Sequence, residues 1–256
     1  MQIHHIRNAT MVIETADKVF LVDPMLGPKG NLPPFTLFRF KPRKNPIIPL
    51  PENTDARLQK VTHCIITHQH PDHLDDEGRH FLREKNVPII CSVKDQKSLK
   101  KEGLNVTQTL NYWETLNFSG IKITGIPAQH GYGFVTKLMG NVMGFYLEIP
   151  DTPSIYLSSD TVYTDAVHKV LTELKPDISV AACGAAQFDI FKPLLMDMND
   201  MLTFFTNAPG KVIANHLEAV NHCPTTREQL REKLRTHNLR DKVFIPEDGE
   251  TITWNA

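Results

Sequence analysis

The segment 67–75, with the sequence THQHPDHLD, constrains this chain more than any other. Four side chains that bind metals well follow the predicted buried strand at 61–67: His68, His70, Asp72 and His73. Because His68 and His70 are two residues apart, they project to the same side of an extended chain. Neutral imidazole and carboxylate groups are typical ligands of zinc-like ions. A solvated turn that caps the next helix is the simpler alternative, but three histidines and an aspartate at this spacing favour a metal site.

Three further ligand-type residues each follow a predicted strand downstream: His130, Asp160 and His216. Each one alone is a weak signal, because a histidine or aspartate after a strand more often caps or hydrogen-bonds a loop. Together with the first cluster they form a set in which every member lies at a predicted strand end. One edge of the sheets would then carry every ligand, as a metal site on a rigid scaffold requires.

The composition is that of an ordinary globular protein. The 256 residues are 41% hydrophobic and 22% charged, and the formal net charge of -1 favours neither a nucleic acid nor a membrane as a partner. The four cysteines form no CxxC pair, which predicts reduced thiols and a cytoplasmic protein. We find no signal peptide and no apolar run long enough to span a bilayer.

The pattern along the chain predicts two kinds of region. Runs rich in β-branched and apolar residues at 2–6, 10–15 and 19–22 indicate a strand meander. The segment 24–51 carries eight of the 18 prolines, which excludes a regular helix or central strand and is typical of a functional lid or of disorder.

From residue 61 onward, strands and helices alternate, and Thr225 with Glu228 predicts a capping box for the last helix. We therefore expect two packed sheets with helices outside, in one domain over 1–256.

The ligand motif resembles that of the metallo-β-lactamase superfamily. The run His68-x-His70-x-Asp72-His73 is followed in order by His130, Asp160 and His216. The resemblance covers nearly the whole chain, since 6–24 resembles the opening meander of that family and 144–161 its central hairpin. The most similar branch contains the ascorbate-phosphate lactonase. The resemblance implies an α/β (α+β) fold, a four-layer αββα sandwich.

The same resemblance implies a centre of two divalent metal ions. One metal would be held by His68, His70 and His130, and the other by Asp72, His73 and His216. Asp160 would bridge them, which agrees with the ability of a carboxylate to bind two cations about 3.5–4 Å apart. Histidine ligands favour Zn²⁺, while the carboxylates also admit Mn²⁺ or Fe²⁺.

Departures from other branches narrow the function. Position 160 is Asp where zinc β-lactamases carry a cysteine, and position 70 is His where the di-iron relatives carry a carboxylate. Antibiotic hydrolysis and redox chemistry are therefore disfavoured. Only residues 161–215 separate Asp160 from His216, which leaves no room for the large insert of the RNA-processing relatives.

Three further features have open roles. His222 is a candidate for contact with the substrate, with a surface or capping role as the alternative. Cys223 beside it is a poor candidate for a nucleophile, because a lone Cys–His pair lacks a third group. The segment 35–44 mixes aromatic residues with four cations, so it could cover the metal site and bind an anionic substrate, pack on a sheet edge, or form oligomer contacts.

We therefore expect a metal-dependent hydrolase. A hydroxide shared by the metals would attack an ester, lactone or related bond of a small molecule, an anionic one included. Asp72 would both hold the second metal and orient the nucleophile. A phosphodiesterase is the first alternative, because the metals alone do not distinguish the two bonds. A metal-binding scaffold without turnover is the second. The expected partner is a small molecule, and a homo-oligomer is compatible with the sequence.

Overall fold

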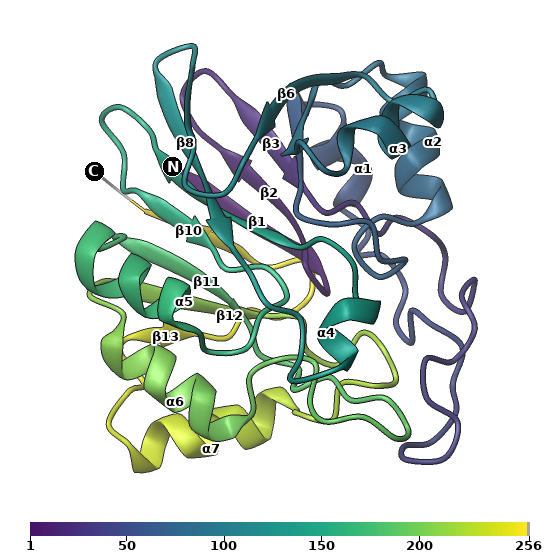
Figure 1. The fold of residues 1–256 in the computed structure, drawn as a ribbon, viewed down its shortest axis with the longest axis vertical. Helices are drawn as coiled ribbons and strands as arrows, with labels where there is room; N and C mark the ends of the chain where they lie inside the picture. Colours follow the sequence, from purple (N-terminus) through teal and green to yellow (C-terminus); the bar gives the residue numbers. More distant parts are fainter. Residues whose placement is uncertain (255–256) are drawn as a thin grey trace.

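Two mixed β-sheets face each other in the computed structural model, which describes residues 1–254 (Figure 1). The first sheet has the strand order β14 (Thr251–Thr253), β1 (Gln2–Arg7), β2 (Thr10–Glu14), β3 (Val19–Val22), β4 (His63–Ile66), β5 (Ile89–Ser92) and β6 (Val106–Leu110). The second has the order β13 (Val243–Phe244), β12 (Lys211–Asn215), β11 (Ile178–Ala182), β10 (Ile155–Leu157), β9 (Met143–Glu148), β8 (Ile121–Pro127) and β7 (Thr115–Phe118).

Helices cover the outer face of each sheet. The first sheet is covered by α1 (Thr54–Leu58), α2 (Asp76–Glu84) and α3 (Gln96–Lys101). The second is covered by α5 (Asp165–Lys169), the π-helical turn η1 (Val170–Leu174), α6 (Met198–Asn207) and α7 (Arg227–Thr236). The short helix α4 (Val135–Leu138) lies beside the loops between the sheets.

Strand β2 shows why the sequence gives four layers. Met11 and Ile13 belong to the apolar cluster between the sheets, whereas Val12 belongs to the cluster under the first helical layer. Successive side chains of a strand point to opposite faces, so a strand buried on both faces reads as a continuous apolar run. Cys64, Ile65 and Ile66 of β4 divide in the same way. The expected αββα sandwich is confirmed.

The first residues form the predicted meander, with strand ends within one residue of expectation. The predicted capping box of the last helix is wrong by one position. Thr226 caps α7. Its side-chain oxygen accepts from the Gln229 amide, and the Gln229 side-chain oxygen accepts from the Thr226 amide. Thr225 is buried instead, and its amide donates to the Gly184 carbonyl at 3.3 Å. The contact of Thr225 with Gly184 therefore leaves Thr226 as the residue that caps the helix.

The proline-rich segment 24–51 is held to the first sheet by polar contacts of its backbone. The fully buried Arg7 guanidinium donates to the carbonyl oxygens of Met25 (2.8 Å), Gly27 (3.0 Å) and Ile48 (3.0 Å). One β1 side chain thus ties both ends of the segment to the sheet.

We predict that Arg7→Met lowers the free energy of unfolding by about 2–4 kcal/mol, because it leaves three carbonyl groups without their charged donor. Urea denaturation measures the change. Arg235→Met is the matched control, because that guanidinium pairs only with the exposed Glu232 on α7. A control as unstable as the Arg7 variant, or an unchanged Arg7 variant, would contradict this role.

Candidate metal centre

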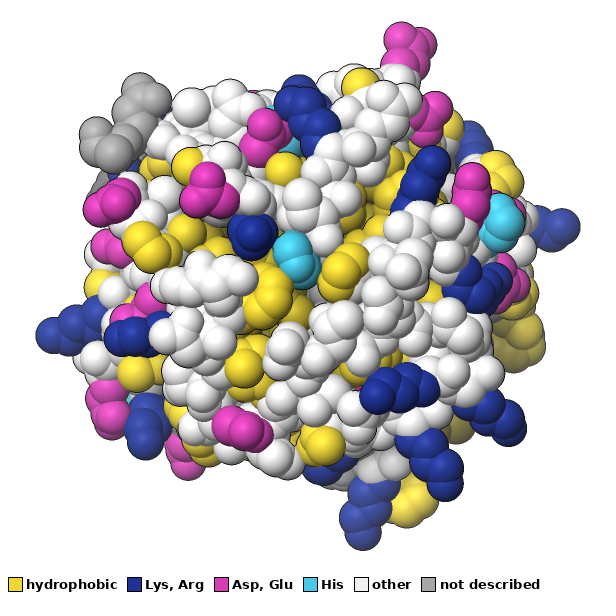
Figure 2. Space-filling view, turned by 90° about the horizontal axis from the view of Figure 1, so that it is seen from above, with side chains coloured by type: hydrophobic (Ala, Val, Ile, Leu, Met, Phe, Trp, Pro, Cys, Tyr) yellow, Lys and Arg dark blue, Asp and Glu magenta, His cyan; other side chains and the backbone are white. Residues whose placement is uncertain are grey.

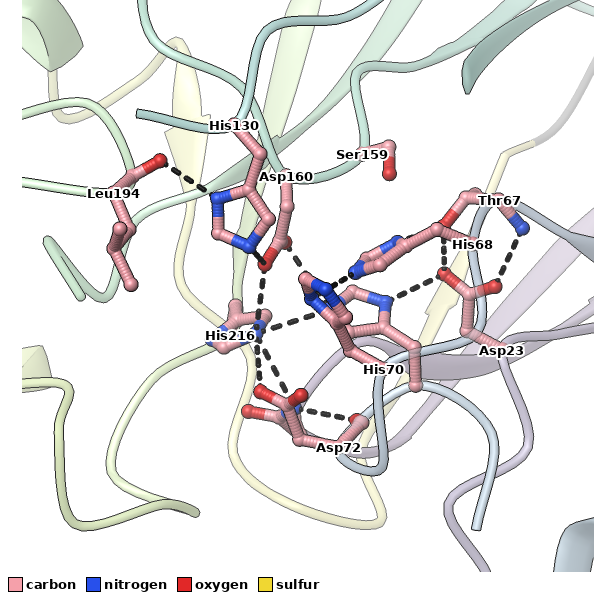
Figure 3. A network of polar contacts seen from close by, with 12 residues as sticks. Asp23, Thr67, His68, His70, Asp72, His130, Ser159, Asp160, Leu194 and His216 are labelled. Atoms are coloured by element: carbon pink, nitrogen blue, oxygen red, sulfur yellow. Dashed lines mark hydrogen bonds and ion pairs between the residues drawn. The ribbon is translucent and has the colours of Figure 1, made fainter. Parts of the chain in front are cut away.

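The ends of four strands position the candidate ligands at one edge of the sandwich (Figure 3). His68 follows β4, His130 follows β8, Asp160 follows β10 and His216 follows β12 directly. His70, Asp72 and His73 lie in the turn between β4 and α2. The structure brings the whole set together, and each member except the half-buried His70 is buried.

Six of the seven side chains form two adjacent triads. Ligand atoms of His68, His70 and His130 lie within 4.8 Å of one another, as do those of Asp72, His73 and His216. In the first triad, His68 Nε2 is 3.1 Å from His70 Nδ1. In the second, His216 Nε2 is 3.2 Å from His73 Nε2 and 3.3 Å from Asp72 Oδ2.

Asp160 lies between the two triads. Its Oδ1 is 3.2 Å from His73 Nε2, and its Oδ2 is 3.4 Å from His130 Nε2. The same Oδ2 is 3.6 Å from His216 Nε2. One carboxylate therefore contacts histidines of both triads, the position that a bridging ligand needs.

These separations fit a pair of metal ions. In a tetrahedral shell with metal–ligand distances of about 2.0–2.1 Å, neighbouring ligand atoms are about 3.3–3.4 Å apart. The contacts of 3.1–3.6 Å within this set lie around that value. Moreover, Asp160 Oδ1 is buried and accepts no hydrogen bond within residues 1–254, because a neutral His73 ring that donates from Nδ1 to Asp23 leaves a lone pair on the Nε2 that lies 3.2 Å away. A buried carboxylate oxygen without a donor is costly unless a cation satisfies it.

Hydrogen bonds on the far side of the rings orient the histidines. His73 Nδ1 donates to Asp23 Oδ2 at 2.8 Å. The Thr67 hydroxyl donates to the same Asp23 oxygen at 2.6 Å, so its own oxygen accepts from His68 Nδ1 at 3.0 Å. His130 Nδ1 donates to the Leu194 carbonyl at 2.9 Å. The Nε2 lone pair of each of these three rings therefore points inward. Metal-bound histidines are oriented in the same way, by a hydrogen bond from their other ring nitrogen.

Sequence reasoning missed Asp23, Asn8 and Cys223. Asn8 Nδ2 donates to the Asp72 carbonyl at 2.9 Å and fixes the turn that carries the ligands. Cys223 Sγ lies 3.4 Å from His216 Nδ1. Of the three, only Asp23 could have been found from the sequence. It follows β3, the parallel neighbour of β4, so it has the same strand-end position as the candidate ligands. Cys223, considered above only as a nucleophile, instead contacts the back of a ligand.

Charge is concentrated in this buried site. Burial disfavours a protonated His73, but Asp160 and Asp23 outweigh that cost and raise its pKa to about 10. Asp160 likewise overcomes burial and raises the pKa of His216 well above its ordinary value. Burial also opposes ionisation of Asp72, yet His216 and His73 hold its pKa well below the usual range. The buried carboxylates are therefore stabilised by nearby positive charge, which protons on the histidines or metal ions can supply.

The backbone at the site is strained. Asn8, Asp23, Ser159 and His216 have φ between 45° and 59°. For residues other than glycine this left-handed region costs about 1–3 kcal/mol each when the surroundings impose it. Such strain often marks a site in which side-chain direction matters more than local stability.

A cavity of about 110 Å³ opens onto both triads. Its wall includes the candidate ligands His70, Asp72 and His130 together with His222. The remaining lining residues are apolar: Phe35, Pro71, Met139, Phe188 and Leu194. His222 therefore lies beside the candidate ligands and lines the cavity next to them.

The segment 35–44 reaches this cavity only through Phe35. Arg39 instead bonds to Gln187 at 2.6 Å, while Lys41 and Arg43 line a separate cavity of about 430 Å³. Among the described residues that line the metal-facing cavity, none is a lysine or arginine. Of the roles that the sequence left open for this segment, a place for its cations in the wall of the metal-facing cavity is not supported by the lining residues.

Comparison with known proteins supports the same conclusion. Residues 18–216 match the family described as the β-lactamase superfamily domain. The UPF0173 protein YddR of Bacillus subtilis is 33% identical over 256 residues, covering 99% of this chain and 100% of that protein. A UPF0173 metal-dependent hydrolase of Brucella canis is 28% identical over 72% of each chain.

A solved structure, the isothiocyanate hydrolase from Delia radicum gut bacteria, aligns over 100% of both chains with a TM-score of 0.91 and 32% identity. Within residues 1–254, no helix combines the length and apolar character needed to cross a membrane. The strand-end histidines, the shared fold and the family match lead to one conclusion: this chain belongs to the metallo-β-lactamase superfamily and is a metal-dependent hydrolase.

Proposed function

We propose that the chain hydrolyses small, uncharged electrophiles at carbon, with isothiocyanates as the favoured substrate class. The observation that carries this proposal is the composition of the cavity beside the triads. Aromatic and aliphatic side chains form most of its wall, and the polar groups are confined to the metal-facing side. Such a cavity suits a compact apolar substituent attached to one reactive group.

The isothiocyanate hydrolase from Delia radicum gut bacteria supports this class, since it is 32% identical over the whole chain. In the proposed reaction, the oxygen of water forms a bond to the central carbon of R–N=C=S. The bond between this central carbon and the nitrogen breaks, and both protons of the water pass to the nitrogen. The products are the amine R–NH₂ and carbonyl sulfide. Ester and lactone carbonyl groups offer a similar electrophilic carbon and remain in the proposed range.

We infer two divalent ions per chain, with zinc favoured by the histidines. His68, His70 and His130 would hold one ion and Asp72, His73 and His216 the other, with Asp160 between them. When bound, the ions would supply a water of pKa about 7 and electrostatic stabilisation of developing negative charge.

Asp72 and His222 are the residues proposed to act on the reactants. Asp72 lines the cavity, so a carboxylate oxygen can accept a hydrogen bond from the attacking water and orient it. Burial lowers the pKa of His222 to about 4, which keeps the imidazole neutral at physiological pH. A neutral imidazole has one N–H, which can donate to the nitrogen or sulfur atom that gains charge.

A phosphodiester substrate fits this cavity less well. Phosphate oxygens are usually bound by arginine or lysine in addition to metal, and the described lining residues include neither. A diphosphatase of the PhnP family is similar at a TM-score of 0.59, but at 14% identity that likeness shows the fold alone.

We also propose a small molecule as the partner, without a nucleic acid or a membrane. The face in Figure 2 carries both signs of charge with hydrophobic side chains between them, and the net charge is -1. Such a surface gives little electrostatic attraction to polyanions.

The first test is a substrate panel with zinc- and manganese-loaded protein. We expect kcat/KM for benzyl isothiocyanate to exceed that for a bis-nitrophenyl phosphodiester by at least about tenfold, or about 1.4 kcal/mol of transition-state stabilisation. Amine release and carbonyl sulfide are measured together, beside phenyl acetate and a γ-lactone. Turnover of the phosphodiester alone would overturn the proposed substrate class.

Removal of Asp160 tests the dinuclear centre. Asp160→Ala should lower kcat by more than about 100-fold, because loss of a direct ligand should exceed the 10–100-fold effect of losing an outer partner. Elemental analysis should find about two metal equivalents in the parent protein and fewer in the variant. The exposed Asp165→Ala on α5 is the control and should keep both metals. Wild-type turnover in Asp160→Ala would show that the bridge is misplaced.

His216 and His222 should separate by metal content. His216→Ala should lose about one equivalent of metal, because its Nε2 lies among Asp72, His73 and Asp160. His222→Ala should keep both metals and change substrate kinetics, because its ring lines the cavity. Metal stoichiometry under identical loading decides, and the reverse pattern would reverse the two assignments.

A further inference from the structure

A carboxylate on one loop holds the backbone of another at the mouth of the cavity. Asp189 Oδ1 accepts from the amides of Phe38 (2.9 Å) and Arg39 (2.8 Å), and its Oδ2 accepts from the amide of Leu37 (3.0 Å). The Thr36 hydroxyl donates to the same side chain. We call this set of contacts the Asp189 clamp.

The clamp joins the tips of two loops, and these tips have little apolar packing, although Phe35, Phe188 and Phe191 beside them pack against buried residues. Phe38 is 88% exposed on the first loop, and Ile190 is 82% exposed on the second. Burial therefore contributes little to the position of these loop tips. Hydrogen bonds to an ionised group are among the stronger polar contacts. The clamp therefore restrains the two loop tips, together with the bonds from Arg39 to Gln187 and Phe191. Asn221 separately holds the backbone of Phe35 and Thr36.

Each end of the clamp is adjacent to an aromatic wall of the cavity. Phe35 immediately precedes Thr36, and Phe188 immediately precedes Asp189. The Phe35 ring meets the His222 ring edge-on, with centroids 5.0 Å apart and planes at 87°. The Phe188 ring stacks on His222 with centroids 5.8 Å apart and planes at 18°. The two loops thus place two aromatic rings around the His222 imidazole in the cavity wall.

We propose that Asp189 is a positioning residue, and that Phe35 and Phe188 determine specificity by packing against the apolar substituent of the substrate. Aromatic pairs attract at centroid distances of about 4.5–7 Å in edge-on or offset arrangements. Substrates with an aryl or arylalkyl substituent should therefore bind better than those with a methyl group. This specificity role rests on the proposed function, in which this cavity is the substrate site.

The test compares Asp189→Ala with the parent protein in two independent ways. Hydrogen–deuterium exchange of the peptide that carries the Leu37, Phe38 and Arg39 amides should become faster, because these amides lose their acceptor. The kcat/KM ratio of benzyl to methyl isothiocyanate should fall about tenfold, mainly through KM of the benzyl substrate. Metal content and kcat for the methyl substrate should stay unchanged.

Asp197→Ala is the matched control. Asp197 also accepts backbone amides, those of Asn199 and Asp200, but it caps α6 and does not line the cavity. It should leave the benzyl-to-methyl ratio unchanged. Asp189→Asn retains one acceptor oxygen and should restore part of the ratio, whereas Phe35→Leu and Phe188→Leu should lower the ratio without faster exchange at 37–39.

The outcomes separate this inference from the proposed function. If the parent protein hydrolyses benzyl and methyl acetate but no isothiocyanate, the substrate class fails, and the same ratio in the ester series still tests the clamp. Calorimetric binding of benzyl thiocyanate gives a readout that needs no turnover, and Asp189→Ala should weaken it about tenfold. Wild-type exchange in Asp189→Ala, or faster exchange with an unchanged benzyl preference in turnover and binding, would overturn the inference.

Discussion

One buried carboxylate, Asp23, orients histidines of both ligand triads. It accepts from His73 directly and reaches His68 through the Thr67 hydroxyl. Because both rings are bound to the same Asp23 oxygen, directly or through Thr67, this carboxylate relates one histidine of each triad to the other. The Thr67 amide also donates to Asp23 at 2.8 Å, which ties the end of β3 to the end of β4. The first-sheet part of the centre is therefore organised by two adjacent parallel strands.

The second sheet supplies the other side of the site, opposite Asp23 and the histidines that it orients. Asp160 and His216 come from β10 and β12, and their positions are imposed at the cost of left-handed backbone at Ser159 and His216. Rigid strands hold the candidate ligands, while Phe35 and Phe188 come from loops outside the sheets. This division would let the cavity beside the candidate ligands vary without disturbing the metal-binding side chains.

Much of the fold was readable because the strands are buried on both faces and form uninterrupted apolar runs. The candidate ligands could be predicted because each of them follows a strand, and because four of them belong to one specific motif. Cys223 and Asn8 carry no such rule, since their contacts to His216 and Asp72 join residues that are distant or irregularly spaced along the chain. The choice between Thr225 and Thr226 could not be made locally, because each is followed three residues later by Glu or Gln.

The direction of the cations in 35–44 was also beyond the sequence. The composition of the segment left a place beside the metal site, a sheet edge and an oligomer contact open, whereas in the structure Asp189 binds the backbone amides of this loop and only Phe35 of the segment lines the cavity. A contact across about 150 residues of chain decides the outcome, and no local pattern encodes it. The polarity of the pocket thus depends on tertiary structure, whereas the metal centre depends mainly on strand ends.

We propose that two metal ions lie side by side in this centre. Anomalous diffraction from crystals loaded with zinc, with data collected on both sides of the zinc absorption edge, locates such ions. Two peaks about 3.5–4 Å apart are expected, one among His68, His70 and His130 and the other among Asp72, His73 and His216, with Asp160 between them. A single peak, or a peak among Asp23, His68 and His73, would contradict it.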